Sequence, residues 1–203
     1  MTDAARLASD ATRAFFGPRA SSWDVRFPND GPAFERAVAD LAPPPGGTAL
    51  DVGCGTARAA PALRSAVGPG GIVVALDLTP EMLAVAVAQG RLGPARLVVA
   101  DANRLPLRDG TAHAVLASGL LPHLSDPAQG LAELARATAR GGRLAIFHPI
   151  VRAALAARHG SEPSNDDVLA AGRISSLLAA SGWVLVELDD AQDRYLDLAC
   201  RTV

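Results

Sequence analysis

The sequence predicts an α/β protein of Rossmann-like architecture, a three-layer sandwich in which helices cover both faces of a mostly parallel sheet. After residue 47, short apolar runs alternate with helical stretches, which is the pattern of parallel strands joined by crossover helices. Most of the runs are apolar almost throughout, as expected for strands that are buried on both faces. A glycine-rich turn joins the first run to the first helical stretch.

The alternating region is expected to contain five strands and three helices. We expect the strands at residues 49–52, 72–77, 96–100, 114–118 and 143–148. We expect the helices at residues 57–67, 80–89 and 127–139. Thr79 and Pro80 suit the N-cap and the first position of the second of these helices.

The C-terminal part follows a different pattern. A longer helical stretch at residues 166–180 precedes two strand-like runs, 183–188 and 195–200. Only a short polar turn at residues 189–193 separates the two runs. They are therefore expected to pair as antiparallel neighbours.

The N-terminal part is predicted to be helical. Helices are expected at residues 3–16 and 31–41, with a break at Gly17 between them. Because nothing else in the chain can cover a ligand at the sheet edge, we expect residues 1–45 to form a helical lid or entry segment. Residues 46–203 are expected to form the α/β domain.

Length and composition limit the possible classes of protein. The chain has 203 residues, of which 49% are hydrophobic and 20% charged, so it can bury one sizeable core. Two cysteines without metal-ligand spacing suggest neither a disulfide framework nor a metal site. A net charge of −2 provides no basic surface for nucleic acid. No signal peptide or membrane span is evident, and a cytoplasmic protein is expected.

The chain contains no lysine, so all 19 basic residues are arginines. A phosphate-binding P-loop needs its lysine, and Schiff-base chemistry needs a lysine amine. Both classes of site are therefore excluded.

The strongest local signal is the turn Gly53-Cys54-Gly55, which follows Asp51 at the end of the first expected strand. Glycines at this point let the backbone approach a ligand closely, and the start of the next helix offers free N–H groups. Such a turn alone is weak evidence, because ordinary tight turns share it.

Two acidic residues supply the context that the turn lacks. Asp77 ends the second expected strand 24 residues after Gly53, and Asp101 follows the third strand after another 24. At the first position an acidic residue can accept hydrogen bonds from ribose hydroxyls, and both lie at the carboxyl edge where open α/β sheets bind ligands. The alternatives are a helix cap for Asp77 and a solvated loop carboxylate for Asp101.

Arg58 argues against a nicotinamide-binding site. It occupies the third glycine position of the dinucleotide fingerprint, where glycine is needed for close packing of the helix on the strand. A nucleotide-dependent oxidoreductase is therefore the weaker interpretation.

Together, five segments resemble the class I S-adenosylmethionine-dependent methyltransferases, especially the small-molecule group typified by ubiquinone and menaquinone methylases. The resemblance covers residues 47–148, about half of the chain. Its segments are residues 50–56, 75–83, 100–107, 120–124 and 140–144.

The resemblance implies S-adenosylmethionine as cofactor and a specific set of contacts. Asp51 is expected at the methionine part, Asp77 at the ribose hydroxyls and Asp101 at the adenine amino group, and no metal is expected. The full set of expected cofactor-binding residues is Asp51, Gly53, Cys54, Gly55, Asp77, Leu78, Met82, Asp101, Ala102 and Ser118.

The resemblance also implies a seven-stranded sheet of order 3-2-1-4-5-7-6 with an antiparallel last strand. The two C-terminal runs would supply the sixth and seventh strands. One departure is plain: the family usually has a third glycine where this chain has Ala57, which could weaken cofactor binding.

Methyl transfer needs an aligned acceptor, exclusion of water and sometimes a base. His123 and His148 follow the fourth and end the fifth expected strands, so they are candidate catalytic residues, with a structural role equally open. His113 is expected to be structural, and His159 is expected to be exposed.

The expected function is methyl transfer to a small molecule, with Trp23 and Arg26 of the lid forming part of the pocket. Simple packing of these side chains on the sheet is the alternative. A binding module that holds the cofactor without turnover is the second interpretation. The sequence does not identify the acceptor atom or the oligomeric state.

Overall fold

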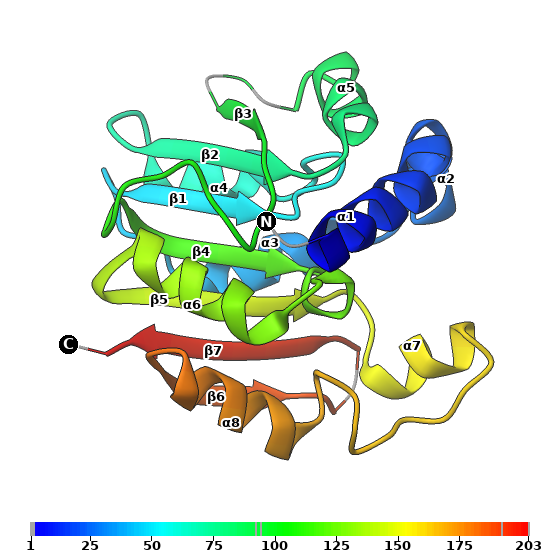
Figure 1. Ribbon diagram of the computed structural model, residues 1–203. Helices are drawn as coiled ribbons and strands as arrows, with labels where there is room; N and C mark the ends of the chain where they lie inside the picture. The colour runs from blue at the N-terminus through cyan, green and yellow to red at the C-terminus, as the bar shows by residue number, and fades with distance from the viewer. Residues whose placement is uncertain (1–2, 92, 94, 192, 203) are drawn as a thin grey trace.

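The computed structural model describes residues 3–91, 93, 95–191 and 193–202. Its centre is a seven-stranded sheet with the order β3-β2-β1-β4-β5-β7-β6 (Figure 1). Strands β1 to β5 are parallel, and β7 is antiparallel to both of its neighbours. The predicted fold class and strand order are confirmed.

The strands are β1 (Thr48–Val52), β2 (Ile72–Asp77), β3 (Arg96–Val99), β4 (Ala112–Ser118), β5 (Thr138–His148), β6 (Trp183–Asp189) and β7 (Tyr195–Arg201). The helices are α1 (Asp3–Phe16), α2 (Trp23–Arg26), α3 (Gly31–Leu41), α4 (Ala60–Val67), α5 (Pro80–Ala88), α6 (Pro127–Ala137), α7 (Arg152–Arg158) and α8 (Ala171–Ala180). Two 3₁₀ helices complete the described elements, η1 (Gly17–Ser22) and η2 (Leu121–His123).

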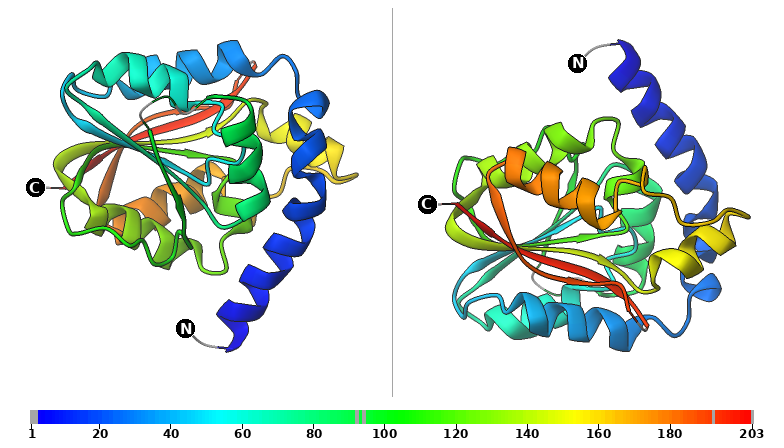
Figure 2. Two further views of the ribbon diagram at one scale, coloured as in Figure 1. Left: turned by 90° about the horizontal axis from the view of Figure 1, so that it is seen from above. Right: turned by 90° about the horizontal axis from the view of Figure 1, so that it is seen from below.

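In the central strands, alternate residues enter two different cores. In β1, Leu50 packs with α6 and α8, whereas Ala49 packs with α3 and α4 on the other face. A smaller cluster joins α5 to the glycine turn. Figure 2 shows helices on both sides of the twisted sheet, so the central strands are buried on both faces as their apolar sequences predict.

The N-terminal helices divide between two locations. Helix α3 packs on β4, β5 and β7, and η1 packs on α5. Helices α1 and α2 lie beside the edge at which β1, β2 and β4 end (Figures 1 and 2). Within the described residues, no helix is long and apolar enough to cross a membrane.

Several boundaries differ from the sequence prediction for local reasons. Helix α4 begins at Ala60 because Ala57 has a left-handed backbone with φ of +56°. Helix α7 was not expected. Helix α8 begins at Ala171 rather than at residue 166. The residues before it form a turn, in which Asp167 accepts a hydrogen bond from the Ser164 N–H at 2.9 Å. Strand β5 is longer than expected, because its early residues extend along β4 through an irregular register.

A buried carboxyl group lies in the middle of β7. Asp197 is fully buried, and the Tyr195 hydroxyl lies within hydrogen-bond distance of Asp197 Oδ2 and 3.1 Å from the Leu169 carbonyl oxygen. A phenol has one proton to donate. Tyr195 donates to Asp197 Oδ2 when this carboxyl group is ionised, and a protonated Asp197 can donate to Tyr195 instead, which leaves the Tyr195 proton for Leu169. Burial raises the pKa of Asp197 to about 7. The hydrogen bond with Tyr195 lowers this pKa, and the negative charge of Asp190 raises it.

This raised pKa predicts a pH-dependent stability. The folded pKa of about 7 lies above the ordinary value of 3.8, so the folded state binds the proton more tightly. The stabilisation is complete below pH ~4 and is lost as the pH rises toward 7. We expect Asp197→Asn, which keeps a donor for Tyr195, to reduce the stability difference between pH 5 and pH 8 by about 1–3 kcal/mol.

Urea unfolding at the two pH values measures this difference. Asp166→Asn, at an exposed position, serves as the matched control and should leave the difference unchanged. An Asp197→Asn protein with the same pH dependence as the parent would contradict the protonated assignment.

Candidate functional site

A cavity of about 470 Å³ lies at the carboxyl edge of the parallel strands. One wall comes from the turns after β1, β2 and β4, and the opposite wall comes from the N-terminal segment. We call residues 3–30, which contain α1, η1 and α2, the cap. The cavity therefore lies between the cap and the sheet, at the edge where open α/β sheets bind ligands.

The structure brings the residues predicted from the sequence together on this cavity. All of the expected cofactor residues except Asp51 line it, and so do Trp23, Arg26, His123 and His148. Asp51 is buried and is not part of the lining. The proposed lid and sheet-edge residues thus share one cavity, and His159 also belongs to it although its side chain is exposed.

The glycine turn has a geometry that larger residues could not adopt without strain. Gly53 and Gly55 have φ of +70° and +53°, in the left-handed region. A Cβ on Gly53 would also lie 2.9 Å from the Leu120 side chain. The Gly53 and Cys54 N–H groups donate to the Leu76 carbonyl oxygen at 2.8 and 3.0 Å, which ties the turn to β2.

Asp77 supports the same turn from the end of β2. Its Oδ2 accepts from the Gly55 N–H at 2.7 Å, and its Oδ1 accepts from the Thr79 N–H at 2.8 Å. Thr79 occupies the N-cap position of α5 but makes no capping bond with its side chain. Burial raises the pKa of Asp77, and the Thr79 and Gly55 hydrogen bonds oppose that rise.

Asp51 lies buried close to Asp77. Burial, followed by the negative charge of Asp77, raises the pKa of Asp51 to about 7. Asp51 Oδ2 has no hydrogen-bond partner among the described residues. Burial and these two carboxylates also raise the pKa of the Cys54 thiol. A thiol with a raised pKa is a poor nucleophile, so Cys54 contributes shape to the turn.

Asp101 is held by contacts from two directions. Its Oδ1 accepts from the Asn103 N–H at 2.9 Å and from Asn103 Nδ2 at 3.1 Å. Its Oδ2 accepts from the Ser9 hydroxyl of α1 at 3.1 Å. One turn further along α1, Arg13 Nε donates to the Leu78 carbonyl oxygen at 3.1 Å. Helix α1 thus crosses the ends of β2 and β3 and closes one side of the cavity.

A charged network joins the cap to the glycine turn, and the sequence did not predict it. Asp24 of the cap accepts from the Thr56 hydroxyl at 2.7 Å and pairs with Arg91 at 2.7 Å. Arg91 also donates to the Thr56 carbonyl oxygen at 3.0 Å. Arg58 pairs with Asp30 at 3.2 Å and donates to the Phe27 carbonyl oxygen. We call these five charged and hydroxyl side chains the latch network.

Both candidate histidines have pKa values below the ordinary value of 6.5. His148 accepts from the Ile150 N–H through Nδ1 at 3.2 Å. Burial lowers the pKa of His148 to about 4, and the positive charge of Arg158 adds to this effect. Burial also lowers the pKa of His123, and the electrostatic interaction with His159 lowers it further. His113 lies at the far end of β4, where its Nδ1 accepts from the Thr48 N–H at 3.1 Å.

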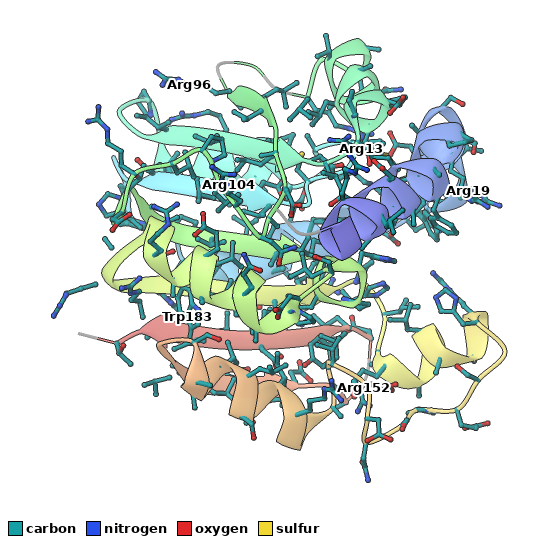
Figure 3. The ribbon with its side chains drawn as sticks, in the orientation of Figure 1. Arg13, Arg19, Arg96, Arg104, Arg152 and Trp183 are labelled. Carbon is teal, nitrogen blue, oxygen red and sulfur yellow. The ribbon has the colours of Figure 1, made fainter. Side chains whose placement is uncertain are left out.

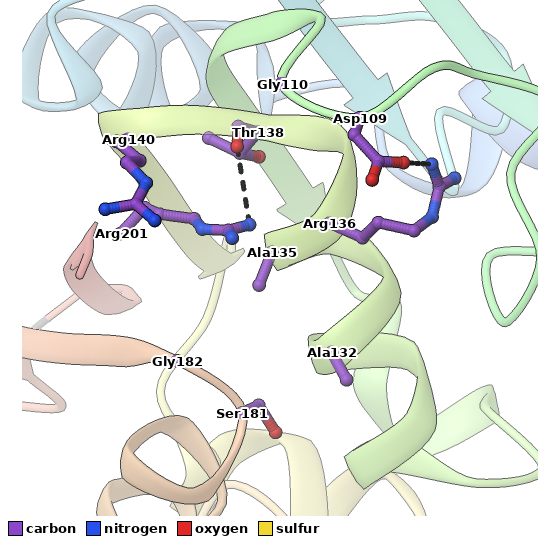
Figure 4. Close-up of a pocket in the computed structure, with 10 residues that line it drawn as sticks. All are labelled: Asp109, Gly110, Ala132, Ala135, Arg136, Thr138, Arg140, Ser181, Gly182 and Arg201. Carbon is purple, nitrogen blue, oxygen red and sulfur yellow. Dashed lines mark hydrogen bonds and ion pairs between the residues drawn. The ribbon is translucent and has the colours of Figure 1, made fainter. Parts of the chain in front are cut away.

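A second hollow of about 430 Å³ lies at the opposite edge, beside the start of β5 and the end of β7 (Figure 4). Two of its arginines, Arg136 and Arg201, contact other groups of the protein. Arg136 pairs with Asp109 and Glu133, and Arg201 lies 3.4 Å from the Thr138 carbonyl oxygen. None of the residues expected to bind the cofactor lines this hollow.

Comparison with known proteins agrees with this geometry. Residues 50–146 match the family described as methyltransferase domain. The demethylmenaquinone methyltransferase of Halalkalibacterium halodurans is 41% identical over 102 residues, which are 49% of this chain and 42% of that protein. The chain spans less than half the length of the first curated relatives that it matches.

Solved structures share the fold at low sequence identity. A SAM-dependent methyltransferase from Aquifex aeolicus has a TM-score of 0.69 at 24% identity, covering 83% of this chain and 89% of that chain. Magnesium protoporphyrin IX methyltransferase from Synechocystis, solved with bound SAH, has a TM-score of 0.72 at 16% identity. The coverage is 96% of this chain and 100% of the other.

The sheet order and the carboxylate-lined cavity beside a glycine turn define a class I methyltransferase fold. The match of residues 50–146 to the methyltransferase domain family agrees with this fold. The resemblance to class I S-adenosylmethionine-dependent methyltransferases of the quinone methylase type is therefore confirmed.

Ala57 replaces the third glycine of the turn, and its geometry makes a prediction. Its left-handed φ of +56° costs an L-residue about 1–2 kcal/mol. Burial of its methyl group stabilises the folded state by about 0.8 kcal/mol. Alanine also lowers the entropy of the unfolded chain relative to glycine, which stabilises the folded state by about 0.4–1 kcal/mol. We expect Ala57→Gly to change the free energy of unfolding by less than about 1 kcal/mol.

Ala86→Gly is the matched control, because Ala86 is buried in the same cluster but lies in helix α5. It should lose about 2 kcal/mol, since it gains no relief of strain. Denaturant unfolding of both variants measures the contrast. Equal losses would show that the Ala57 backbone carries no strain.

Proposed function

We propose that this chain transfers a methyl group from S-adenosylmethionine to a small-molecule acceptor. The observation that carries the proposal is the set of three carboxylates, Asp51, Asp77 and Asp101, gathered near a left-handed glycine turn within the family-matched segment. The small-molecule acceptor is supported by the demethylmenaquinone methyltransferase relatives. The cofactor supplies an electrophilic methyl group on a cationic sulfur.

The residues of the cavity fit this cofactor in charge and in shape. Asp77 would hold the ribose hydroxyls, because each of its oxygens accepts one N–H and keeps a second lone pair. Asp101 Oδ2, which accepts one bond from Ser9, would likewise accept from the adenine amino group. Leu78 and Met82, which line the cavity, would flank the adenine.

Asp51 would act on the cationic part of the cofactor from beneath the glycine turn. Its unpartnered Oδ2 and raised pKa are what a buried carboxylate shows when no positive charge is nearby. An ammonium or sulfonium group on the other side of the turn would stabilise the ionised form. Gly53 and Gly55 carry no side chains, so they leave room for this approach.

The chemistry demands positioning more than proton transfer. The cap would exclude water and align the acceptor, which is the main requirement of an in-line displacement. If the acceptor must lose a proton, His123 is the better candidate. His148, with a pKa of about 4, would hold a proton only weakly at neutral pH.

The oxidoreductase alternative is disfavoured by the role of Arg58. Its guanidinium extends to Asp30 and Phe27 of the cap, so it does not provide the close helix-to-strand contact of a dinucleotide site. A binding module without turnover is distinguished from an enzyme by acceptor methylation. Incubation with a radiolabelled methyl donor and a small-molecule extract should label product only if the chain is an enzyme.

The cofactor assignment predicts selective binding. The protein should bind S-adenosylhomocysteine and S-adenosylmethionine in calorimetric titrations, and NAD should not compete. Asp77→Asn should weaken binding about 10-fold or more, because it removes a charge-assisted hydrogen bond. Asp193→Asn, at an exposed position remote from the cavity lining, should bind as the parent does. Binding of NAD alone would contradict the proposal.

The role of Asp51 predicts a pH dependence. A carboxyl group with a pKa of about 7 is mostly protonated at pH 5.5 and mostly ionised above pH 7.5. Lowering the pH keeps the α-amino group of the ligand protonated, so affinity for S-adenosylhomocysteine should fall as the pH is lowered from 7.5 to 5.5. Asp51→Asn should bind more weakly at pH 7.5 and show a flatter profile. An unchanged profile would remove Asp51 from cofactor binding.

A further inference from the structure

The cavity has two halves of different chemistry. The half over the glycine turn contains the carboxylates Asp77 and Asp101. The outer half lies between the cap and the segment after β5, and its lining is aromatic and cationic. The lining side chains of the outer half include Phe16, Arg19, Trp23, Arg26, Phe27, His123, His148, Arg158 and His159.

The aromatic side chains form a continuous wall. The ring centroids of Phe16 and Trp23 are 5.5 Å apart, and those of Trp23 and Phe27 are 5.0 Å apart. His123 extends the wall from the sheet side, with its ring 4.9 Å from that of Phe16 at an interplanar angle of 86°. Such a wall suits a flat or apolar ligand body.

The cations of the outer half have no acidic partners. Among the described residues, no carboxylate lies within 4.0 Å of Arg19, Arg26 or Arg158, whereas Arg58 pairs with Asp30. The Arg158 guanidinium instead lies 5.6 Å from the Phe27 ring centroid. Figure 3 shows Arg19 on the N-terminal segment, on the side of the molecule where β1 and β4 end.

Among the described residues, the carboxylates of the cavity do not pair with these arginines: Asp77 and Asp101 lie in the inner half, and Asp30 is paired with Arg58. Asp30 pairs with Arg58, Asp77 accepts two backbone N–H groups, and Asp101 accepts from Asn103 and Ser9. After burial, the positive charge of Arg158 further lowers the pKa of His148. The outer half is therefore electropositive.

We propose that the methyl acceptor is an acid, with a carboxylate or phosphate group bound beside Arg158 and an aromatic or flat apolar body packed along Phe16, Trp23 and Phe27. This inference rests on the proposed function and names its substrate class. Arg158 is a specificity residue for the acceptor, because α7 and the cap, rather than the glycine turn, place it in the cavity.

Three naphthyl probes test the inference on protein saturated with S-adenosylhomocysteine: 2-naphthoate, its neutral isostere 2-naphthamide, and 2-naphthyl phosphate. At least one of the two anions should bind about 5-fold or more tightly than the amide, and the preference should shrink at high salt. Comparison of the two anions identifies the acidic group.

Arg158→Gln should remove the preference for the anion while leaving the affinity for S-adenosylhomocysteine unchanged. Arg158→Lys should retain part of the preference, because it keeps the charge but loses the planar fork. Arg173→Gln, an exposed arginine of α8, is the matched control and should behave as the parent does.

Equal binding of the three probes, or binding of none, would overturn the inference. So would an equal loss of S-adenosylhomocysteine affinity in Arg158→Gln, since the arginine would then serve the carboxylate of the cofactor. If S-adenosylhomocysteine itself failed to bind, the proposed function would be wrong. The probes titrated without it would still decide whether an acid is preferred.

Discussion

The parallel pairing of β1 with both β2 and β4 is the constraint on which the site depends. Asp51 pairs in register with Ala75 of β2 and Leu116 of β4, so the ends of three central strands meet at one edge. The strands are apolar along most of their length, and Asp51, Asp77 and Ser118 stand at or next to their carboxyl ends. Packing of the core thus positions the carboxylates and the glycine turn at the carboxyl edge of the sheet.

Two carboxyl groups are buried in the fold, where burial disfavours their ionised form. Asp51 and Asp197 are both buried with pKa values raised to about 7. Among the described residues, Asp51 Oδ2 and Asp197 Oδ1 both lack a hydrogen-bond partner, whereas Asp197 Oδ2 lies within hydrogen-bond distance of the Tyr195 hydroxyl. The two groups differ in location, because Asp197 lies in the middle of β7 and Asp51 lies next to the glycine turn at the cavity.

Local patterns predicted the fold and much of the site. The apolar runs located the strands, and the spacing of Gly53, Asp77 and Asp101 brought the expected ligands to one edge. The pairing of Arg91 with Asp24 could not be predicted, because these residues are 67 positions apart and no periodicity links them. Helix α7 was also missed, since its short alanine-rich sequence, Arg152–Arg158, has none of its residues fully buried.

The latch network connects the cap to the glycine turn through side-chain contacts. Thr56 belongs to the turn and Asp24 to the cap, and the two side chains are joined at 2.7 Å. Movement of the cap away from the sheet would therefore break this hydrogen bond together with the Arg91–Asp24 and Arg58–Asp30 ion pairs. The two facing walls of the cavity are thus held by one set of contacts, so a substitution in the latch network would disturb both walls at once.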